Sequence, residues 1–256
     1  MRVVISAGGT GGHIYPALAI INKIKEMEPN SEFLYIGTTN RMEKDLIPSM
    51  GYRYEGIEVT GFKRKLTLDN FKTITNFINA IKRCKIIIKD FDPDIVIGCG
   101  GYVTAPVIYA AKKLGKKTFI HEQNSVVGLA NKFLARYTDK IGVSFESTIK
   151  DFPKGKAILT GNPCSEKALS IKKTTKEKLD IAKDKKLVLI VMGSLGSRTI
   201  NDKIFSFIDK FRSKNYSVII VTGNSYYERV KDKRVPSNVK VLPFIYQKPS
   251  VKKITH

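Results

Sequence analysis

The sequence predicts an α/β protein built from two Rossmann-like, doubly wound units, of which the second is incomplete. Short runs of β-branched residues alternate with helical patterns along most of the 256 residues. Three glycine-rich turns each follow one of these runs directly, and a turn sequence at Gly161-Asn162-Pro163 interrupts the alternation. Alternating strands and helices are typical of parallel sheets that carry helices on both faces.

In chain order, the first unit is expected to form strands at residues 3–7, 33–36, 95–97, 118–120 and 140–143, with helical patterns between them. The second unit resumes after a lysine-rich stretch with a strand at 187–191, a helix around 199–211 and a strand at 217–221. We place the boundary at the Gly161 turn, so that the two domains cover residues 1–160 and 161–256.

The composition limits the classes of partner. A formal net charge of +22 and a pI near 9.8 favour polyanions such as nucleic acid, acidic lipid or a phosphorylated substrate. The alternative is a generally lysine-rich composition, because the lysines are scattered along the chain. Nucleic acid is not expected as a partner, since the sequence has no recognition-helix, RNP or zinc signature.

Cysteine usage and hydropathy point to the cytoplasm. Cys84, Cys99 and Cys164 are odd in number and lack C-x-x-C spacing, so neither a disulfide framework nor a zinc site is expected. The N-terminus does not resemble a signal peptide, and no apolar run approaches the length of a bilayer span. Membrane contact, if it occurs, is expected to be peripheral.

The first glycine-rich turn predicts a phosphate site. Val3-Val4-Ile5 leads into Ser6-Ala7-Gly8-Gly9-Thr10-Gly11-Gly12-His13, and a helical pattern follows. Glycines let the backbone approach an anion, and the N–H groups and dipole of the next helix favour negative charge. The turn lacks the G-x-G-x-x-G spacing, and no acid follows the second strand, which disfavours NAD. The missing Gly-Lys-Ser/Thr disfavours a P-loop.

Two further turns, Gly98-Cys99-Gly100-Gly101 and Gly193-Ser194-Leu195-Gly196-Ser197, also follow predicted strands. Ligands of open α/β sheets bind at the carboxyl ends of the strands. One glycine turn alone is more often structural, but three at this edge predict a phosphorylated ligand in a cleft between the domains. The sequence His121-Glu122-Gln123-Asn124 supplies polar groups at the same edge.

His13 is the predicted general base, because an imidazole titrates near neutral pH and lies beside N–H groups suited to an anion. Asn131, on the helix after residue 124, either binds substrate or only ties loops together. Asp92-Pro93-Asp94 has the D-x-D pattern of metal-dependent sugar transferases, but it precedes a strand and is interpreted as a turn at the amino edge. We therefore expect no metal site, and helix N-termini and side chains are expected to stabilise a leaving diphosphate.

A basic and apolar segment follows the second predicted strand region. Lys63-Arg64-Lys65 and residues 66–89 combine cations with Phe71, Ile74, Phe77, Ile78 and Ile81 at helical spacing. This pattern predicts either a core-facing helix with a solvated basic face or an interfacial patch that meets anionic lipid.

These motifs together resemble the MurG family of peptidoglycan GlcNAc transferases, in glycosyltransferase family 28. The resemblance rests on Gly-Gly-Thr-Gly-Gly-His at 8–13, Gly-Gly-Tyr-Val-Thr-Ala-Pro from Gly100, His-Glu-Gln-Asn at 121, Gly-Leu-Ala-Asn-Lys from Gly128, Gly-Asn-Pro at 161 and Gly-Ser-Leu-Gly-Ser-Arg-x-x-Asn from Gly193. It implies a two-domain glycosyltransferase B fold that needs no metal or other cofactor.

The resemblance further implies inverting transfer of GlcNAc from UDP-GlcNAc to the MurNAc C4 hydroxyl of lipid I, giving lipid II, at the cytoplasmic face of the bacterial membrane. The first domain would bind lipid I and the membrane, and the second would bind UDP-GlcNAc. His13 would be the base. The implied substrate-binding residues are Thr10, Gly11, Gly12, Gly100, Gly101, Tyr102, Asn124, Asn131, Ser165, Ser194, Asn201 and Ile245. The first turn is thereby assigned to both substrates.

The sequence departs from the family at two places. Ser165 occupies the position of an arginine that contacts the nucleotide, which removes a cation and a bidentate donor. The sequence also ends shortly after Pro243-Phe244-Ile245, before the segment in which the family carries a diphosphate-binding helix and a ribose-binding glutamate. We therefore expect this chain to be poorly active. The alternatives are a non-catalytic fragment that binds anionic lipid or lipid-linked diphosphate, and a sugar-nucleotide epimerase of the same architecture.

Overall fold

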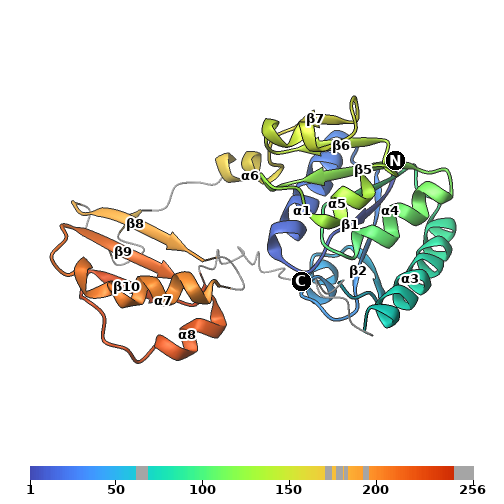
Figure 1. The fold of residues 1–256 in the computed structure, drawn as a ribbon. Coiled ribbons are helices and arrows are strands. Elements are labelled where there is room, and N and C mark those ends of the chain that lie inside the picture. The colour runs from blue at the N-terminus through green and yellow to red at the C-terminus, as the bar shows by residue number, and fades with distance from the viewer. Residues whose placement is uncertain (62–68, 171–174, 177–180, 182–183, 193–195, 245–256) are drawn as a thin grey trace, which may run out of the picture. The chain divides into compact units, whose positions relative to one another are not determined.

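The computed structural model describes residues 1–61, 69–170, 175–176, 181, 184–192 and 196–244 (Figure 1). The chain divides into two compact units, Met1–Ile171 and Lys172–His256. The division falls later than the predicted boundary after residue 160. The reason is that helix α6 (Cys164–Ser170) packs against helix α1 (Gly11–Met27) of the first unit.

The first unit is a seven-stranded parallel sheet with the strand order β3-β2-β1-β4-β5-β6-β7. Its strands are β1 (Arg2–Ser6), β2 (Glu32–Thr38), β3 (Arg53–Ile57), β4 (Ile95–Gly98), β5 (Lys117–Glu122), β6 (Lys140–Val143) and β7 (Ala157–Leu159). Besides α1 and α6, its helices are α2 (Glu43–Ser49), α3 (Asp69–Phe91), α4 (Thr104–Lys113), α5 (Leu129–Leu134) and the 3-10 helix η1 (Glu146–Asp151). The predicted doubly wound α/β fold is confirmed.

Successive side chains of each strand point to opposite faces of the sheet, so they pack in two separate cores. Val3 and Ile5 pack with Ile14 and Ile21 of α1 on one face of the sheet. Val4 packs on the other face, in a core that α3, α4 and α5 complete. Figure 1 shows α1 on one side of the sheet and α3 with α4 on the other. Burial on both faces explains why the central strands are continuous apolar runs.

The topology places the first two glycine turns at a switch point. From β1 the chain proceeds to β2 and β3 on one side, whereas β4 lies on the other side of β1 and leads to β5, β6 and β7. The order therefore reverses between β1 and β4, and ligands of open α/β sheets bind where such a reversal occurs. The turn after β1 holds residues 7–10, and the turn after β4 holds residues 99–103.

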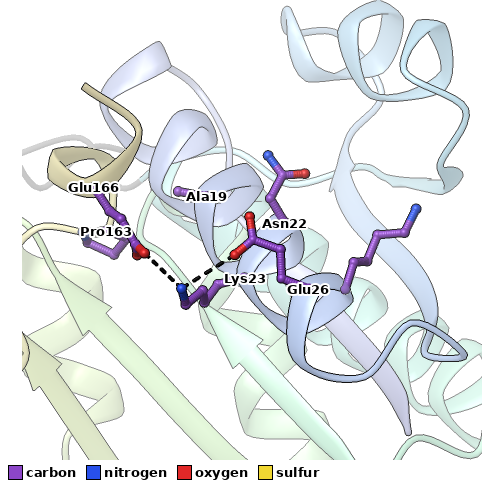
Figure 2. A pocket seen from close by; sticks show the side chains of 7 residues that line it. Ala19, Asn22, Lys23, Glu26, Pro163 and Glu166 are labelled. Atoms are coloured by element: carbon purple, nitrogen blue, oxygen red, sulfur yellow. Dashed lines mark hydrogen bonds and ion pairs between the residues drawn. The ribbon is translucent and has the colours of Figure 1, made fainter. Parts of the chain in front are cut away.

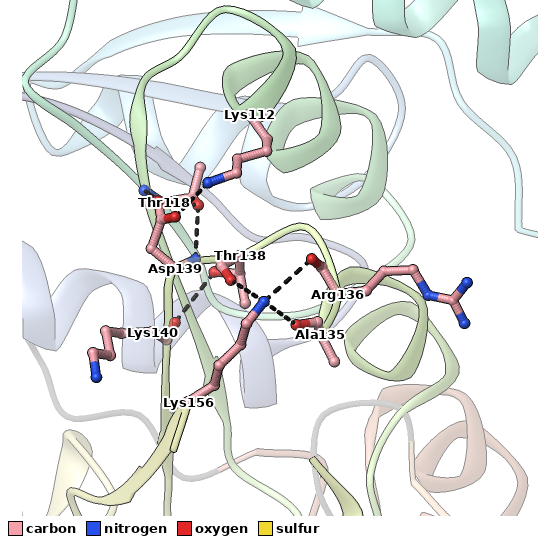
Figure 3. Close-up of polar contacts among 8 residues, drawn as sticks. All are labelled: Lys112, Thr118, Ala135, Arg136, Thr138, Asp139, Lys140 and Lys156. Atoms are coloured by element: carbon pink, nitrogen blue, oxygen red, sulfur yellow. Dashed lines mark hydrogen bonds and ion pairs between the residues drawn. The ribbon is translucent and has the colours of Figure 1, made fainter. Parts of the chain in front are cut away.

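A lysine fixes the end of α5, which contributes to the site described below. Lys156 Nζ donates hydrogen bonds to the carbonyl oxygens of Ala135 (3.1 Å), Arg136 (3.2 Å) and Thr138 (2.8 Å), just beyond the last turn of α5 (Figure 3). These carbonyls lack partners within the helix, and a cation is favoured at a helix C-terminus. Beside this cluster, Asp139 accepts hydrogen bonds from Lys112 and Thr118.

A second cluster joins α6 to α1. Lys23 Nζ lies 2.7 Å from Glu166 Oε1 and 3.4 Å from Glu26 Oε2 (Figure 2). These residues line a pocket of about 430 Å³ with Asn22 and Pro163. Lys23 is twelve residues from the start of α1, which places this pocket about 18 Å along the helix from the glycine turns. We assign the cluster a structural role.

The second unit contains a three-stranded parallel sheet in the order β10-β9-β8. Its elements are β8 (Lys186–Val191), α7 (Arg198–Ser206), the 3-10 helix η3 (Ile208–Phe211), β9 (Tyr216–Val221), α8 (Asn224–Val230) and β10 (Val239–Leu242). Ile204 and Ile208 pack on Val218 and Ile220 of β9, whereas Ile219 and Val221 pack in a core on the opposite face. None of the described helices is long and apolar enough to cross a membrane.

Candidate active site

The two glycine turns of the first unit lie against each other. The amide of Gly8 donates to the carbonyl of Gly100 (3.3 Å), and the amide of Cys99 donates to the carbonyl of Ser6 (2.8 Å). A Cβ on Gly101 would lie 2.4 Å from the Gly8 carbonyl oxygen, and Gly101 has a φ of +84°. Only glycine combines this conformation with so close an approach. The turns thus form one continuous backbone surface.

His13 lies on that surface. Its Nδ1 is 3.1 Å from the carbonyl oxygen of Gly8, and a Cβ on Gly100 would lie 2.6 Å from the imidazole Cδ2. A carbonyl oxygen only accepts, so Nδ1 carries the proton in the neutral ring and Nε2 keeps the lone pair. Gly8 and Gly100 therefore orient the ring, and Nε2 is the nitrogen that can act as a base.

The start of α1 provides a place for an anion. Thr10 is the N-cap residue and makes no side-chain capping hydrogen bond, and the first turn contains no acidic residue. Gly12 is exposed, whereas Gly11 is buried. The first N–H groups of a helix have no partners within the helix, and its dipole favours negative charge there. The start of α1 is thus suited to the phosphate that the sequence predicts there.

Glu43 holds the first glycine turn by hydrogen bonds, a role that the sequence analysis missed. Its side chain is fully buried. Oε2 accepts from the amide of Gly9 (3.3 Å), and Oε1 accepts from the amide (3.2 Å) and the hydroxyl (2.7 Å) of Thr38. Both oxygens therefore accept hydrogen bonds from the chain around them. Glu43 thereby ties the turn after β1 to the end of β2.

Arg41 is a second residue that the sequence analysis missed. It is exposed, and a side-chain hydrogen bond with Tyr102 raises the pKa of its guanidinium. Tyr102 belongs to the second glycine turn, so the cation lies beside the predicted phosphate surface. No motif marked Arg41, because its partner is 61 positions away in the sequence.

The buried Glu122 carboxylate is the centre of a hydrogen-bond network around the motif at 121–124. Glu122 Oε1 accepts from the amide (2.9 Å) and side chain (2.8 Å) of Asn124, and Oε2 accepts from the amide of Gly128 and from Asn131 Nδ2, both at 2.9 Å. Asn131 is 3% exposed. These contacts favour the alternative in which Asn131 ties loops together. Asn124 is exposed, and its Nδ2 is engaged by Glu122.

His121 joins this network to the chain after β7. Its Nε2 is 3.0 Å from the carbonyl oxygen of Gly161 and 3.2 Å from Thr160 Oγ1. Burial lowers the pKa of His121, and the hydrogen bond to Gly161 opposes this shift. The residue is 1% exposed, so we interpret His121 as a structural support and not as a base for a substrate.

The second unit carries its own turns at the carboxyl edge of its sheet. Asn201 is fully buried, and its Nδ2 donates to the carbonyl oxygen of Thr222 (3.0 Å). A Cβ on Gly196 would lie 2.4 Å from the same oxygen. The turns after β8 and β9 are thus joined, as in the first unit. The predicted site residues Ser194 and Ile245 lie outside the described residues, and Ser165 is exposed at the start of α6.

Asp92 and Asp94, the D-x-D pair, lie at the edge of the first sheet that is opposite to the glycine turns. Asp92 pairs with Lys116, which lowers the pKa of Asp92, and Asp94 Oδ2 accepts from the amide of Arg2 (2.7 Å). Both precede β4, at its amino end. Among the described residues, no group of three or more His, Cys, Asp or Glu side chains is arranged to hold a metal ion.

The parallel sheet, its switch point and the paired glycine turns define a Rossmann-like domain of the glycosyltransferase B type. Comparison with known proteins agrees. Residues 3–143 match the N-terminal domain of glycosyltransferase family 28. A MurG crystal structure from Acinetobacter baumannii superposes with a TM-score of 0.67 at 25% identity, covering 95% of this chain and 68% of that one.

Curated relatives identify the family more closely. A UDP-N-acetylglucosamine–N-acetylmuramyl-(pentapeptide) pyrophosphoryl-undecaprenol N-acetylglucosamine transferase of Bacillus cereus is 48% identical over 98% of this chain and 70% of its own length. The Listeria welshimeri protein of that name is 44% identical over the same shares. A UDP-GlcNAc 2-epimerase of Neisseria meningitidis, at 17% identity and a TM-score of 0.62, covers 96% of this chain and 73% of that one and shares the fold. The chain belongs to the MurG family of glycosyltransferase family 28.

Proposed function

We propose that the protein transfers GlcNAc from UDP-GlcNAc to the C4 hydroxyl of the MurNAc in lipid I, with inversion, and so forms lipid II. The observation that carries this proposal is the placement of His13. Its Nδ1 is bonded to the Gly8 carbonyl and its Nε2 keeps the lone pair, on a surface of two joined glycine turns. The 48% identity to the Bacillus cereus transferase supports the choice of substrates.

In this proposal, His13 Nε2 removes the proton from the acceptor hydroxyl as its oxygen attacks C1 of GlcNAc. The new C1–O bond forms on the face opposite UDP, the old C1–O bond breaks, and its electron pair leaves with the diphosphate. A general base of this kind contributes about 10²- to 10⁴-fold to the rate. Inversion follows because one displacement occurs.

The two domains divide the substrates. Residues 1–160 bind lipid I, with its diphosphate on the amides of the first two turns, among them Gly11, Gly12 and Gly101. Residues 161–256 contribute part of the UDP-GlcNAc site, and the third turn with Ser194, Asn201 and Ile245 belongs to it. Ser165 replaces a family arginine, so we propose a lower affinity for UDP-GlcNAc.

We propose that amides and helix N-termini, and not a metal held by Asp92 and Asp94, stabilise the leaving diphosphate. Both carboxylates lie at the amino edge of the sheet, where Lys116 and the Arg2 amide engage them. The site residues lie at the carboxyl edge. The test is transfer activity in EDTA, which this account expects to persist.

We further propose peripheral binding to the anionic cytoplasmic face of the membrane. Ile74 and Ile78 of α3 are about half exposed, and Leu129 and Phe133 of α5 are exposed as well. The net charge of +22 favours anionic lipid. Lys63-Arg64-Lys65 lie outside the described residues. Binding to phosphatidylglycerol vesicles should weaken with salt and with Ile78→Ser.

The deciding experiment is steady-state transfer from UDP-GlcNAc to a soluble lipid I analogue, with the Bacillus cereus relative as the reference. This chain spans 70% of that relative's length. We expect lipid II analogue with inverted configuration and a rate below that of the reference, because Ser165 offers the nucleotide no cation. A turnover equal to the reference would contradict the predicted poor activity. A different product, such as epimerised UDP-GlcNAc, would contradict the proposed function.

A further inference from the structure

An apolar pocket adjoins the paired glycine turns of the first unit. Its volume is about 520 Å³, within the range of about 300–1,000 Å³ usual for ligand pockets. Four segments form it besides His13: residues 59–61 after β3, Phe77 on α3, the second turn with the start of α4, and the start of α5. All of these belong to the same compact unit.

The walls of this pocket suit hydrocarbon. Half of the lining residues have apolar side chains, and three more are glycines: the apolar ones are Val59, Phe77, Ala105, Leu129, Ala130 and Phe133. Its polar side chains are those of His13, Thr60 and Tyr102, and the described lining includes no Asp, Glu, Lys or Arg. A nucleoside placed here would find only these three polar side chains for the many hydrogen-bonding groups of its ribose and base, and polar groups left without partners are costly to bury.

The pocket is rigid where it meets α5. The Phe77 and Phe133 rings pack edge to face with centroids 6.2 Å apart, and Phe133 also stacks on Tyr109 at 6.4 Å. The hydrogen bonds of Lys156 hold the other end of α5, as described above. The cavity is therefore built from packed side chains of several elements and not from one flexible loop.

The position of the pocket beside the glycine turns indicates which kind of ligand it binds. Gly101 belongs both to the phosphate surface and to the pocket wall, and His13 touches both. A phosphate bound on the turns thus has its ester substituent at the pocket mouth. The chemistry that fits both surfaces is a diphosphate that carries a hydrocarbon chain.

We propose that this pocket binds the first isoprenyl units of the lipid carrier of the acceptor. The inference rests on the proposed function, and it assigns the first two turns to the acceptor and not to the nucleotide. In this proposal the hydrocarbon chain leaves the diphosphate at Gly101 and contacts Ala105, Ala130, Phe77 and Phe133, all of which line the pocket. The exposed Leu129 lies at the rim.

The test compares methyl, dimethylallyl and geranyl diphosphate as ligands of the 256-residue protein by isothermal titration calorimetry. Each added isoprenyl unit buries several CH₂ equivalents, so geranyl diphosphate should bind at least about tenfold more tightly than methyl diphosphate. Ala130→Trp, which fills the pocket, should remove this preference and leave the affinity for methyl diphosphate unchanged.

Two further variants sharpen the test. Leu129→Gln changes an exposed rim residue, so it should fold normally and weaken geranyl diphosphate only. Ile86→Trp is the matched control, because Ile86 is exposed on α3 and lies nine residues from Phe77, on the opposite side of that helix. It should behave as the unsubstituted protein does.

Several results would overturn the proposal. One is equal affinity for all three diphosphates, and another is an unchanged chain-length preference in both Ala130→Trp and Leu129→Gln. Displacement of geranyl diphosphate by monomeric dihexanoyl-phosphatidylglycerol at equal concentration would assign the pocket to bilayer lipid instead. Transfer that proceeds equally well with lipid-free and prenylated acceptors would refute the proposed role of the pocket and leave the proposed function standing. Chain-length-dependent binding without any transfer would refute the proposed function and leave the pocket standing.

Discussion

Replacing Glu43 by glutamine tests whether a buried carboxylate positions the phosphate surface. The substitution keeps the shape of the side chain but turns one oxygen into an NH₂ group. Oε1 accepts two hydrogen bonds from Thr38, so the amide oxygen of glutamine is expected to take that position. The NH₂ group then faces the amide of Gly9, where Oε2 accepts a 3.3 Å bond in the native protein. Two donors meet, and the turn must shift.

The magnitude follows from the loss of this one acceptor. A buried donor left without a partner costs about 1–3 kcal/mol. We expect Glu43→Gln to lower the free energy of unfolding by that amount, measured by urea denaturation. Because the displaced turn carries the acceptor diphosphate in our account, the affinity for a lipid I analogue should fall roughly tenfold.

The matched control is Glu26→Gln, on the exposed part of α1, where Glu26 pairs with Lys23. Exposed pairs contribute about 0–1 kcal/mol, so this variant should retain both stability and acceptor affinity. If Glu43→Gln matched the control in both measurements, the Glu43 carboxylate would not position the turn. A stability loss with unchanged acceptor affinity would limit Glu43 to a structural role.

Three further predictions address the base and the supporting clusters. His13→Gln should lower kcat by at least about 100-fold with little change in acceptor affinity, and a smaller loss would exclude it as the base. Lys156→Met should lower the unfolding free energy by about 1–3 kcal/mol, because three carbonyls at the end of α5 lose a charged donor, whereas the exposed Lys154→Met should not. Burial raises the pKa of Asp139, but hydrogen bonds from Lys112 and Thr118 outweigh it and lower the pKa overall. Its folded pKa thus lies below the unfolded value, so its stabilisation is present above about pH 4 and is lost as the pH falls through the folded pKa. In Asp139→Asn, the free energy of unfolding should therefore fall less steeply as the pH is lowered below about 4. An unchanged pH dependence would contradict this assignment.

The central strands could be predicted from the sequence because both of their faces are buried. Val3-Val4-Ile5 and Ile95–Ile97 are continuous apolar runs, and glycine turns follow both. The two edge strands of the seven-stranded sheet escaped prediction. Arg53–Ile57 contains polar residues and a glycine, and Ala157–Leu159 has only three residues. An edge strand needs one partner and little burial, so its sequence carries a weak signal.

The candidate site was predictable where glycine is required by the backbone. Gly101 combines a positive φ with close contact to Gly8, and this need is visible in the sequence as a glycine pair. Glu43 and Arg41 could not be found in this way. The glycine-turn residues that they contact, Gly9 and Tyr102, are distant in sequence, and Glu and Arg are common on surfaces. Asn131 shows the opposite case, since a motif residue is buried against Glu122.

The central claim is that backbone amides of the two joined turns hold the acceptor diphosphate. The most direct measurement is an amide ¹H–¹⁵N titration of the protein with a lipid I analogue in EDTA. The account predicts the largest saturable shifts at Gly11, Gly12 and Gly101. Shifts confined to surface lysine segments, or shifts that appear only when a divalent cation is added, would contradict it.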